Sequence, residues 1–281
     1  MNQLSTEKRA QIIGMLCEGM SMRATARLTG ASVITVMKLL VDAGEAAHDY
    51  HDKTVRGLHC KRVQMDEIWA FCYAKQKHAP ESMRGQPSVG DIWSWAALCA
   101  DTKLVISYRV GTRSADDADA FVADLASRLV DRVQLTADGY GPYLSAVPGA
   151  FGRDVDFARL IKKYGAPVDD PRRYSPPQCI GTERHTVIGN PDPDHVSTSY
   201  VERQNLNLRM HNRRFTRLTN AFSKKAENHA HAFALQTLHH YFARIHTTLR
   251  VTPAMEAGLA DHVWTLEEMA GLLERSEKSA A

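Results

Sequence analysis

The sequence predicts an α/β protein in which a mixed sheet flanked by helices follows a small all-α unit. Three observations support this fold class. Three short helical patterns separated by glycine turns occupy about the first 45 residues. Apolar strand patterns follow from residue 63, and a helical pattern and a further strand come after them. The 281 residues are 44% hydrophobic and 24% charged, which is enough for a core and excludes a disordered or collagen-like chain.

The N-terminal unit has the pattern of three helices. Apolar positions recur with a period of about 3.6 residues over three stretches, 6–18, 22–29 and 33–41. Ser21 and Ser32 are placed to be the N-caps of the second and third helices, and Gly30 ends the second. Three short helices with a glycine turn before the third are typical of a helix-turn-helix unit. We therefore expect residues 1–45 to form a helix-turn-helix DNA-binding domain.

A basic linker is expected next. The helical periodicity is lost after residue 43, and Lys53–Arg62 contains four bases and no acid. This linker covers residues 46–62.

The second domain, expected over residues 63–250, begins with strands. Strand patterns cover four stretches, 63–72, 92–100, 104–110 and 133–137. The second and third form a hairpin, and a helix over 114–130 separates the third from the fourth. This strand, helix, strand order implies a parallel pairing through a right-handed crossover. Asp66 lies in the middle of the first strand, and Asp138 directly follows the fourth.

The remainder is expected to be a loop and helices. Residues 165–198 contain six prolines and few periodic apolar positions, which predicts a long loop or small insertion. A helix follows over about 199–210, and a long helix over about 224–249 is expected to stop before Pro253. Residues 251–281 would form a C-terminal helical tail.

Three acids are candidate catalytic and metal-binding residues: Asp66, Asp138 and Glu202. Each has a structural alternative, since Asp138 could begin a turn and Glu202 could form a capping box with Ser199. Asp66 is harder to explain, because a carboxylate inside an apolar strand is costly to bury without a partner. Glu67 points to the opposite strand face from Asp66 and is not expected to be a ligand.

Parallel neighbouring strands would bring Asp66 and Asp138 together, and the helix from residue 199 could add Glu202. Two carboxylates about 4 Å apart repel by roughly 4 kcal/mol at an effective dielectric near 20, so the three need compensating cations. Oxygen-only ligands suit Mg²⁺ or Mn²⁺. Two such ions about 4 Å apart can activate an attacking oxygen and stabilise the leaving oxygen of a phosphodiester. We therefore expect two ions at this site.

Local charge supports a DNA partner, although the net charge is only +3. Residues 199–225 contain seven bases and one acid, and the other 254 residues have a combined charge of −3. The alternative is a solvated basic face without a ligand. Four arginines in this region are expected to contact the DNA backbone: Arg203, Arg209, Arg213 and Arg214. Arg209 lies two helical turns after Glu202 on the same face.

The helix-turn-helix unit supplies a second set of candidate DNA contacts. Arg23 and Arg27 could bind phosphates, and Ser32, Thr35 and Lys38 are the polar groups of the expected recognition helix. Residues 1–45 have five bases and four acids, so a helical bundle for protein contacts remains an alternative.

The cysteines and the apolar runs indicate the cellular compartment of the protein. Five cysteines include no C-x-x-C pair, and no apolar signal segment begins the sequence. The longest apolar run, around residues 92–100, is far shorter than the roughly 20 residues of a membrane helix. We expect a cytoplasmic protein without a membrane partner.

Three segments around the acids resemble one known family. Ser199–Asn205 (SYVERQN), continued through 213–225 (RRFTRLTNAFSKK), closely resembles the C-terminal catalytic signature of bacterial insertion-sequence transposases of the DDE type, in the branch typified by insertion sequence one. Gln64–Trp69 (QMDEIW) and Leu135–Tyr140 (LTADGY) resemble the family's two aspartate motifs. Tyr241–Pro253 resembles the closing helix and turn of integrase-like cores. The resemblance covers about residues 63–265.

This resemblance implies a ribonuclease-H-like core, two Mg²⁺ ions, nicking at transposon ends and attack of the freed 3′-hydroxyl on target DNA. Asp66, Asp138 and Glu202 match the family's three acids in order. Many relatives have an N-terminal zinc-binding segment with cysteine pairs, which this sequence lacks, so zinc is not implied. Because two DNA ends must be cut and joined, a homodimer or higher oligomer on DNA is expected.

Two other functions remain open at this stage. A helix-turn-helix transcriptional regulator would use the acids only structurally and would not need Mg²⁺. A stand-alone metal-dependent nuclease would cleave DNA without strand transfer or preference for a terminal sequence.

Overall fold

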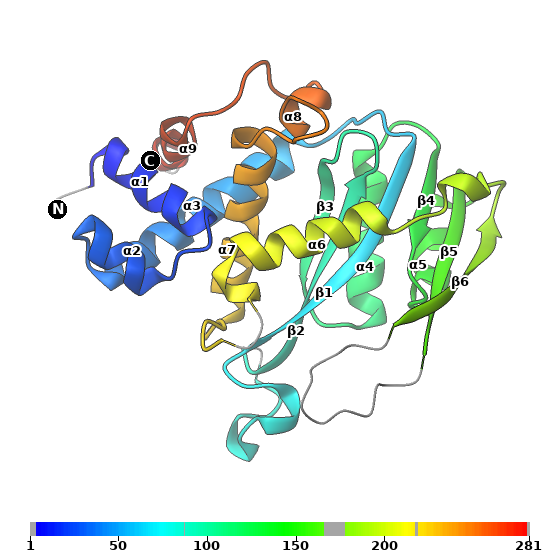
Figure 1. Cartoon of the computed structure of the whole chain (residues 1–281), viewed down its shortest axis with the longest axis horizontal. Coiled ribbons are helices and arrows are strands. Elements are labelled where there is room, and N and C mark those ends of the chain that lie inside the picture. The colour runs from blue at the N-terminus through cyan, green and yellow to red at the C-terminus, as the bar shows by residue number, and fades with distance from the viewer. Residues whose placement is uncertain (1–3, 87, 166–177, 217–218, 280–281) are drawn as a thin grey trace.

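A six-stranded open sheet forms one side of the molecule, and the N-terminal helices lie at the other end (Figure 1). The computed structural model describes residues 4–86, 88–165, 178–216 and 219–279. The strands are β1 (Arg62–Cys72), β2 (Gly90–Cys99), β3 (Val105–Gly111), β4 (Val133–Ala137), β5 (Val155–Tyr164) and β6 (Cys179–Ile188). Their order is β3-β2-β1-β4-β5-β6. β4 is parallel to both β1 and β5, whereas the other pairs are antiparallel. The predicted mixed α/β sheet is therefore confirmed.

Helices cover both faces of this sheet. The main ones are α4 (Ala115–Arg128), α5 (Tyr143–Phe151) and α6 (Ser199–His211). The backbone of α6 bonds to Gln64, while α5 reaches Glu67 through Tyr143. Because alternate residues of a strand point to opposite faces, α5 and α6 lie on opposite sides of β1. The predicted parallel pairing is also confirmed, since α4 connects β3 to β4, which lies parallel beside β1.

The N-terminal helices are α1 (Thr6–Cys17), α2 (Met22–Thr29) and α3 (Val33–Thr54). Ser21 and Ser32 are the predicted N-caps, and Gly30 ends α2 in the left-handed conformation with φ of 71°. The length of α3 differs from the prediction, because the helix continues to Thr54. The expected linker over 46–62 is therefore wrong for 46–54. The buried face of α3 continues through alanine and glycine, which give little apolar signal.

Helix α3 connects the N-terminal helices to the core. It packs against α7 (Ala226–Leu238). Gly44 allows this close approach, since a Cβ atom there would lie 2.5 Å from the carbonyl oxygen of His231. The N-terminal unit and the sheet domain are thus joined by a helix–helix contact.

The C-terminal region differs from the expected single long helix. α7 leads into a π-helical turn, His239–Ala243, and the helical chain ends at Arg244. Pro253 begins α8 (Pro253–Glu256), with Thr252 as its N-cap, so the proline starts a helix and does not stop one. α9 (Leu266–Ser279) packs back on α1 and α3. The predicted helical tail is thus part of the N-terminal helical layer.

The predicted loop or insertion over 165–198 is partly wrong. Residues 179–188 form β6, an edge strand that pairs with β5. Most β6 side chains are exposed, which explains the weak apolar pattern. β5 and α5 were not predicted, and residues 166–177 of the expected loop lie outside the described residues.

Within the described part of the chain, no single helix is long and apolar enough to cross a membrane. α2 and α3 meet the length and composition requirements only as a pair bent by 113°.

Candidate active site

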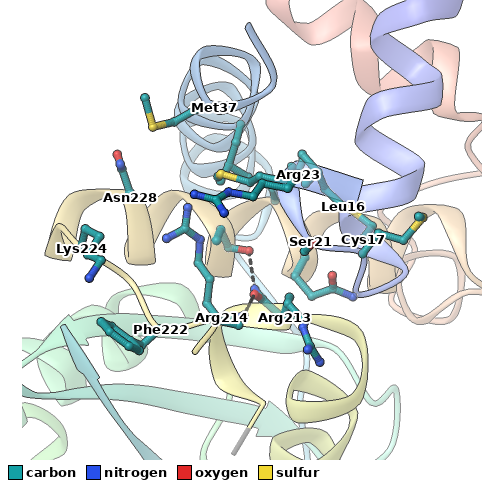
Figure 2. Close-up of a pocket in the computed structure, with 18 of the residues that line it drawn as sticks. Leu16, Cys17, Ser21, Arg23, Met37, Arg213, Arg214, Phe222, Lys224 and Asn228 are labelled. Carbon is teal, nitrogen blue, oxygen red and sulfur yellow. Dashed lines mark hydrogen bonds between the residues drawn. The ribbon is translucent and has the colours of Figure 1, made fainter. Parts of the chain in front are cut away.

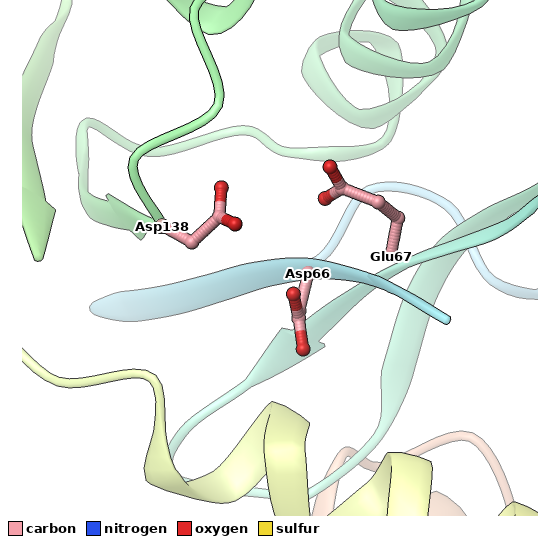
Figure 3. A group of neighbouring side chains, drawn as sticks. All are labelled: Asp66, Glu67 and Asp138. Atoms are coloured by element: carbon pink, nitrogen blue, oxygen red, sulfur yellow. The ribbon is translucent and has the colours of Figure 1, made fainter. Parts of the chain in front are cut away.

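Asp66 and Asp138 lie side by side at the centre of the sheet. The parallel register pairs Met65 with Ala137, so the next residue of each strand is an aspartate. One carboxylate oxygen each from Asp66, Glu67 and Asp138 lies within 4.8 Å of the other two (Figure 3). The expected convergence of the two aspartates is therefore present.

Glu202 shares a pocket with both aspartates. This pocket has a volume of about 440 Å³. Besides the three acids, its lining comprises Gly139, Leu160, Ile161, Lys162, Tyr164 and Thr198. Glu202 lies outside the group of three close carboxylates and instead accepts hydrogen bonds from Lys162 and Thr198. The three acids expected from sequence thus face one space.

Helix α6 is fixed against β1 by two polar contacts. The Gln64 side-chain oxygen accepts hydrogen bonds from the backbone N–H groups of Tyr200 (2.8 Å) and Val201 (3.2 Å). Gln64 thereby satisfies N–H groups that a helix N-terminus leaves without partners. Asn205 donates to Asp66 Oδ2 at 2.8 Å. Both contacts determine where α6 presents Glu202.

The structure tests the two structural alternatives, a capping box for Glu202 and a turn for Asp138. Glu202 bonds the Thr198 hydroxyl and pairs with Lys162, so it is not the acceptor of a capping box with Ser199. Asp138 does stabilise a turn, because Oδ1 accepts from the N–H of Tyr140 at 2.8 Å. Its Oδ2 lies 3.9 Å from Arg113, so the carboxylate has a second neighbour beyond the turn.

Glu67 is the acid that sequence reasoning missed. It lies on the opposite face of β1 from Asp66, as predicted, but its carboxylate still belongs to the close group (Figure 3). Its side chain is 1% exposed. Arg113 Nε donates to Glu67 Oε1 at 2.9 Å, and Tyr143 Oη donates to Oε2 at 3.2 Å. The sequence signal that could have identified Glu67 is its position next to Asp66 in a predicted strand, because a strand covered on both faces places each of two adjacent acids against protein.

Arg113 connects Glu67 to Asp138. Its guanidinium contacts two aromatic rings, with its carbon 4.6 Å from the Trp93 centroid and 4.4 Å from the Tyr140 centroid. The Tyr140 hydroxyl also donates to the Arg113 carbonyl at 2.9 Å. Cation–π contacts of this kind restrict where a guanidinium can lie. Arg113 therefore acts as a fixed positive charge beside two of the carboxylates.

The site retains more negative charge than its neighbours neutralise. Burial, together with the charges of Glu67 and Asp138, raises the pKa of Asp66 to about 7. Burial and Asp138 likewise raise the pKa of Glu67 to about 7, although Arg113 and Tyr143 oppose this. A raised acid pKa means that the ionised form is disfavoured. A cation in the pocket would remove this penalty.

The predicted DNA contacts on and after α6 lie in different environments. Arg203 is exposed, while Arg209, Arg213 and Arg214 are half-buried. Arg214 donates to Ser223 Oγ at 2.9 Å.

The predicted contacts of the N-terminal unit are mostly accessible. Arg23, Arg27, Ser32 and Lys38 are exposed, and Thr35 is half-buried. Ser32 Oγ accepts from the Thr35 N–H and lies 2.8 Å from the Thr35 hydroxyl. These two hydroxyls are therefore partly occupied with capping α3.

No known family model matches the chain, and no curated protein matches it significantly.

Proposed function

We propose that the chain is a DNA transposase of the DDE type, which cleaves transposon ends and transfers the freed 3′-hydroxyl to target DNA. The observation that carries this proposal is the shared pocket of Asp66, Asp138 and Glu202, three acids separated by 72 and 64 positions in sequence. The sequence motifs around them support the same assignment. The strand order is compatible with a ribonuclease-H-like core.

The pocket suits divalent metal ions. Its ionisable ligands are carboxylates, the donors that Mg²⁺ and Mn²⁺ prefer. Burial and the neighbouring charges of Glu67 and Asp138 raise the pKa of Asp66 to about 7, so a cation would stabilise its ionised form. We assign Asp66, Asp138 and Glu202 as the residues that would hold two such ions. When bound, the ions would supply activation of the attacking oxygen and stabilisation of the leaving oxygen.

The chain's own residues would bind and orient the DNA. Arg203 and Arg209 lie on the helix that presents Glu202, where they can bind backbone phosphates beside the acids. Gln64 and Asn205 hold this helix against β1. The N-terminal helices, with Arg23 and Arg27 exposed, would recognise the transposon ends. A working complex would contain two or more protomers, because two ends are joined, and would act on DNA in the cytoplasm.

The test is DNA cleavage by the full chain with Mg²⁺ or Mn²⁺. The substrate is a plasmid that carries the chain's gene and its flanking DNA, and products are mapped at nucleotide resolution. We expect metal-dependent nicks at two defined ends and joined products. Asp66→Asn should reduce cleavage at least about 10³-fold while it binds the same DNA. Asp154→Asn, at an exposed acid outside the pocket, is the matched control.

Two outcomes would replace the proposal. Cleavage without joined products or end preference would indicate a stand-alone nuclease. Specific DNA binding without metal-dependent cleavage, equal in wild type and Asp66→Asn, would indicate a transcriptional regulator.

A further inference from the structure

A second pocket lies between the N-terminal helices and the segment that follows α6 (Figure 2). Its volume is about 300 Å³, at the lower end of the roughly 300–1,000 Å³ that is usual for small-ligand sites. One wall comes from lining residues between 16 and 40, and the other comes from residues 212–214 and from lining residues between 220 and 236. It shares no lining residue with the carboxylate pocket.

The ionisable charge of this second pocket is entirely positive. Its lining contains four bases and no acid, namely Arg23, Arg213, Arg214 and Lys224. Figure 2 shows the guanidinium groups of Arg23 and Arg214 directed into the space. Arg214 bonds the neutral Ser223 hydroxyl, and no carboxylate of the described chain forms an ion pair with Arg23 or Arg214. Arg214 is half-buried and Arg23 is exposed. Since a half-buried charge is normally paired, Arg214 favours an anionic ligand, and Arg23 adds a second positive charge beside it.

The rest of the lining suits an aromatic ring with polar edges. Met20, Met22, Met37 and Phe222 offer apolar and polarisable surface. Methionine sulfur makes favourable contacts with aromatic rings. Four side-chain amides also line the pocket. Asn212 bonds the Ala232 carbonyl and the Arg214 N–H, and the other three are Asn220, Asn228 and Gln236. A side-chain amide both donates and accepts hydrogen bonds, which matches the edge of a nucleobase.

We propose that this pocket binds a nucleotide, with the phosphate at Arg23 and Arg214 and the base against the methionines and Phe222. The nucleotide could be free or could be an unpaired nucleotide of bound DNA, and only the second source depends on the proposed function. Asn212 lies ten residues after Glu202, about 15 Å along α6. That distance corresponds to about four or five nucleotide steps of about 3.4 Å.

The first test is calorimetric titration of the full chain with dAMP, dTMP and inorganic phosphate, in buffer with a metal chelator. Each mononucleotide should bind at one site and more tightly than phosphate. Arg23→Gln and Arg214→Gln should each weaken nucleotide binding about ten- to a hundredfold, because each removes a charge-assisted hydrogen bond. Arg153→Gln, which removes an exposed arginine outside the pocket, should leave it unchanged.

A further variant covers the case in which Arg214→Gln does not fold. Met37 is 40% exposed, so Met37→Asp can add a negative charge to the lining with little effect on the core. It should abolish nucleotide binding while the melting temperature is retained. Nucleotide affinity equal to that of phosphate, or wild-type affinity in Arg23→Gln and Met37→Asp, would overturn the proposal.

A second experiment distinguishes the two sources. A duplex with one unpaired nucleotide is compared with the same duplex fully paired, again without metal. If the duplex with the unpaired nucleotide binds more tightly, and Met37→Asp removes this difference, the pocket binds an unpaired nucleotide of DNA. Binding of mononucleotides without this gain assigns it to a free nucleotide. Neither titration needs DNA cleavage, so both results stand whether or not the chain is a transposase.

Discussion

Asp66 and Glu67 are consecutive residues of one strand that meet their partners on opposite faces of the sheet. Asp66 faces Asn205 of α6, whereas Glu67 faces Arg113 and Tyr143. Their carboxylates nevertheless lie close to each other and to Asp138. Two neighbouring residues therefore have different roles, since Asp66 opens to the pocket and Glu67 is enclosed by the protein.

The raised pKa of Asp66 predicts a pH-dependent stability. Its ordinary pKa of 3.8 rises to about 7 in the folded chain, so ionisation costs more there than in the unfolded chain. Without metal, the free energy of unfolding should fall as pH rises from about 4 to about 7, by up to about 4 kcal/mol from this group.

Thermal melts of the wild type and Asp66→Asn measure this effect. Asp66→Asn should equal the wild type near pH 4 and melt higher near pH 8 in chelator. Added Mg²⁺ should then stabilise the wild type more than the variant. Parallel pH profiles for both proteins would show that Asp66 does not titrate as described.

Arg113 is predicted to position Asp138 for catalysis. Arg113→Ala removes the ion-pair partner of the buried Glu67 carboxylate and should lower the free energy of unfolding by about 2–3 kcal/mol. This loss is smaller than for a fully buried ion pair, because Arg113 is partly exposed. Cleavage should fall about 10–100-fold through kcat, because Asp138 loses a fixed neighbour.

The double variant Arg113→Ala/Glu67→Gln separates stability from positioning. A neutral glutamine in place of Glu67 no longer needs the arginine, so stability should largely return while cleavage stays low. Full recovery of cleavage in the double variant would mean that Arg113 has only a structural role.

At the scale of elements, the pocket lined by Asp66, Asp138 and Glu202 depends on how α6 docks on β1. Gln64 lies 136 positions before Tyr200, yet its side chain caps the helix that presents Glu202. The N-cap residue of this helix, Thr198, makes no side-chain cap bond. The geometry of Glu202 is therefore set by a residue of the strand that presents Asp66.

Gln64→Ala should expose this dependence. Loss of the two hydrogen bonds should cost about 1–2 kcal/mol of stability and reduce cleavage about 10–100-fold, as a displaced catalytic group does. Gln134→Ala is the matched control, since Gln134 makes two similar bonds to the Asp192 backbone. If both variants lose activity equally, the cap on α6 has no special part in catalysis.

The predictable elements were those with a strong internal pattern. β1, the β2–β3 hairpin, α4 and β4 have alternating or helical apolar spacing, and the order of these elements implied the parallel pairing. β6 was missed because its side chains are mostly exposed, and the second half of α3 was missed because alanine and glycine form its buried face. The acids were found by position, but the Glu67–Arg113 pair joins residues 46 positions apart and gave no local signal.

At the scale of the whole molecule, the helical layer and the sheet domain form a continuous structure. α3 packs on α7, and α9 returns from the C-terminal end to α1 and α3 (Figure 1). The two pockets lie at opposite ends of α6, one beside Glu202 and the other beside Asn212. DNA that follows this helix would contact both, so end recognition and cleavage could be coupled through α6 without a flexible linker.

The central claim is that Asp66, Asp138 and Glu202 form one metal-binding centre. The most direct measurement is a crystal structure of the full chain grown with Mn²⁺, with anomalous scattering recorded to locate the ions. We expect Mn²⁺ between the Asp66 and Asp138 carboxylates, and Glu202 released from Lys162 to join a second ion. Ordered Mn²⁺ elsewhere, with this pocket metal-free and the Lys162–Glu202 pair intact at saturating Mn²⁺, would contradict the account.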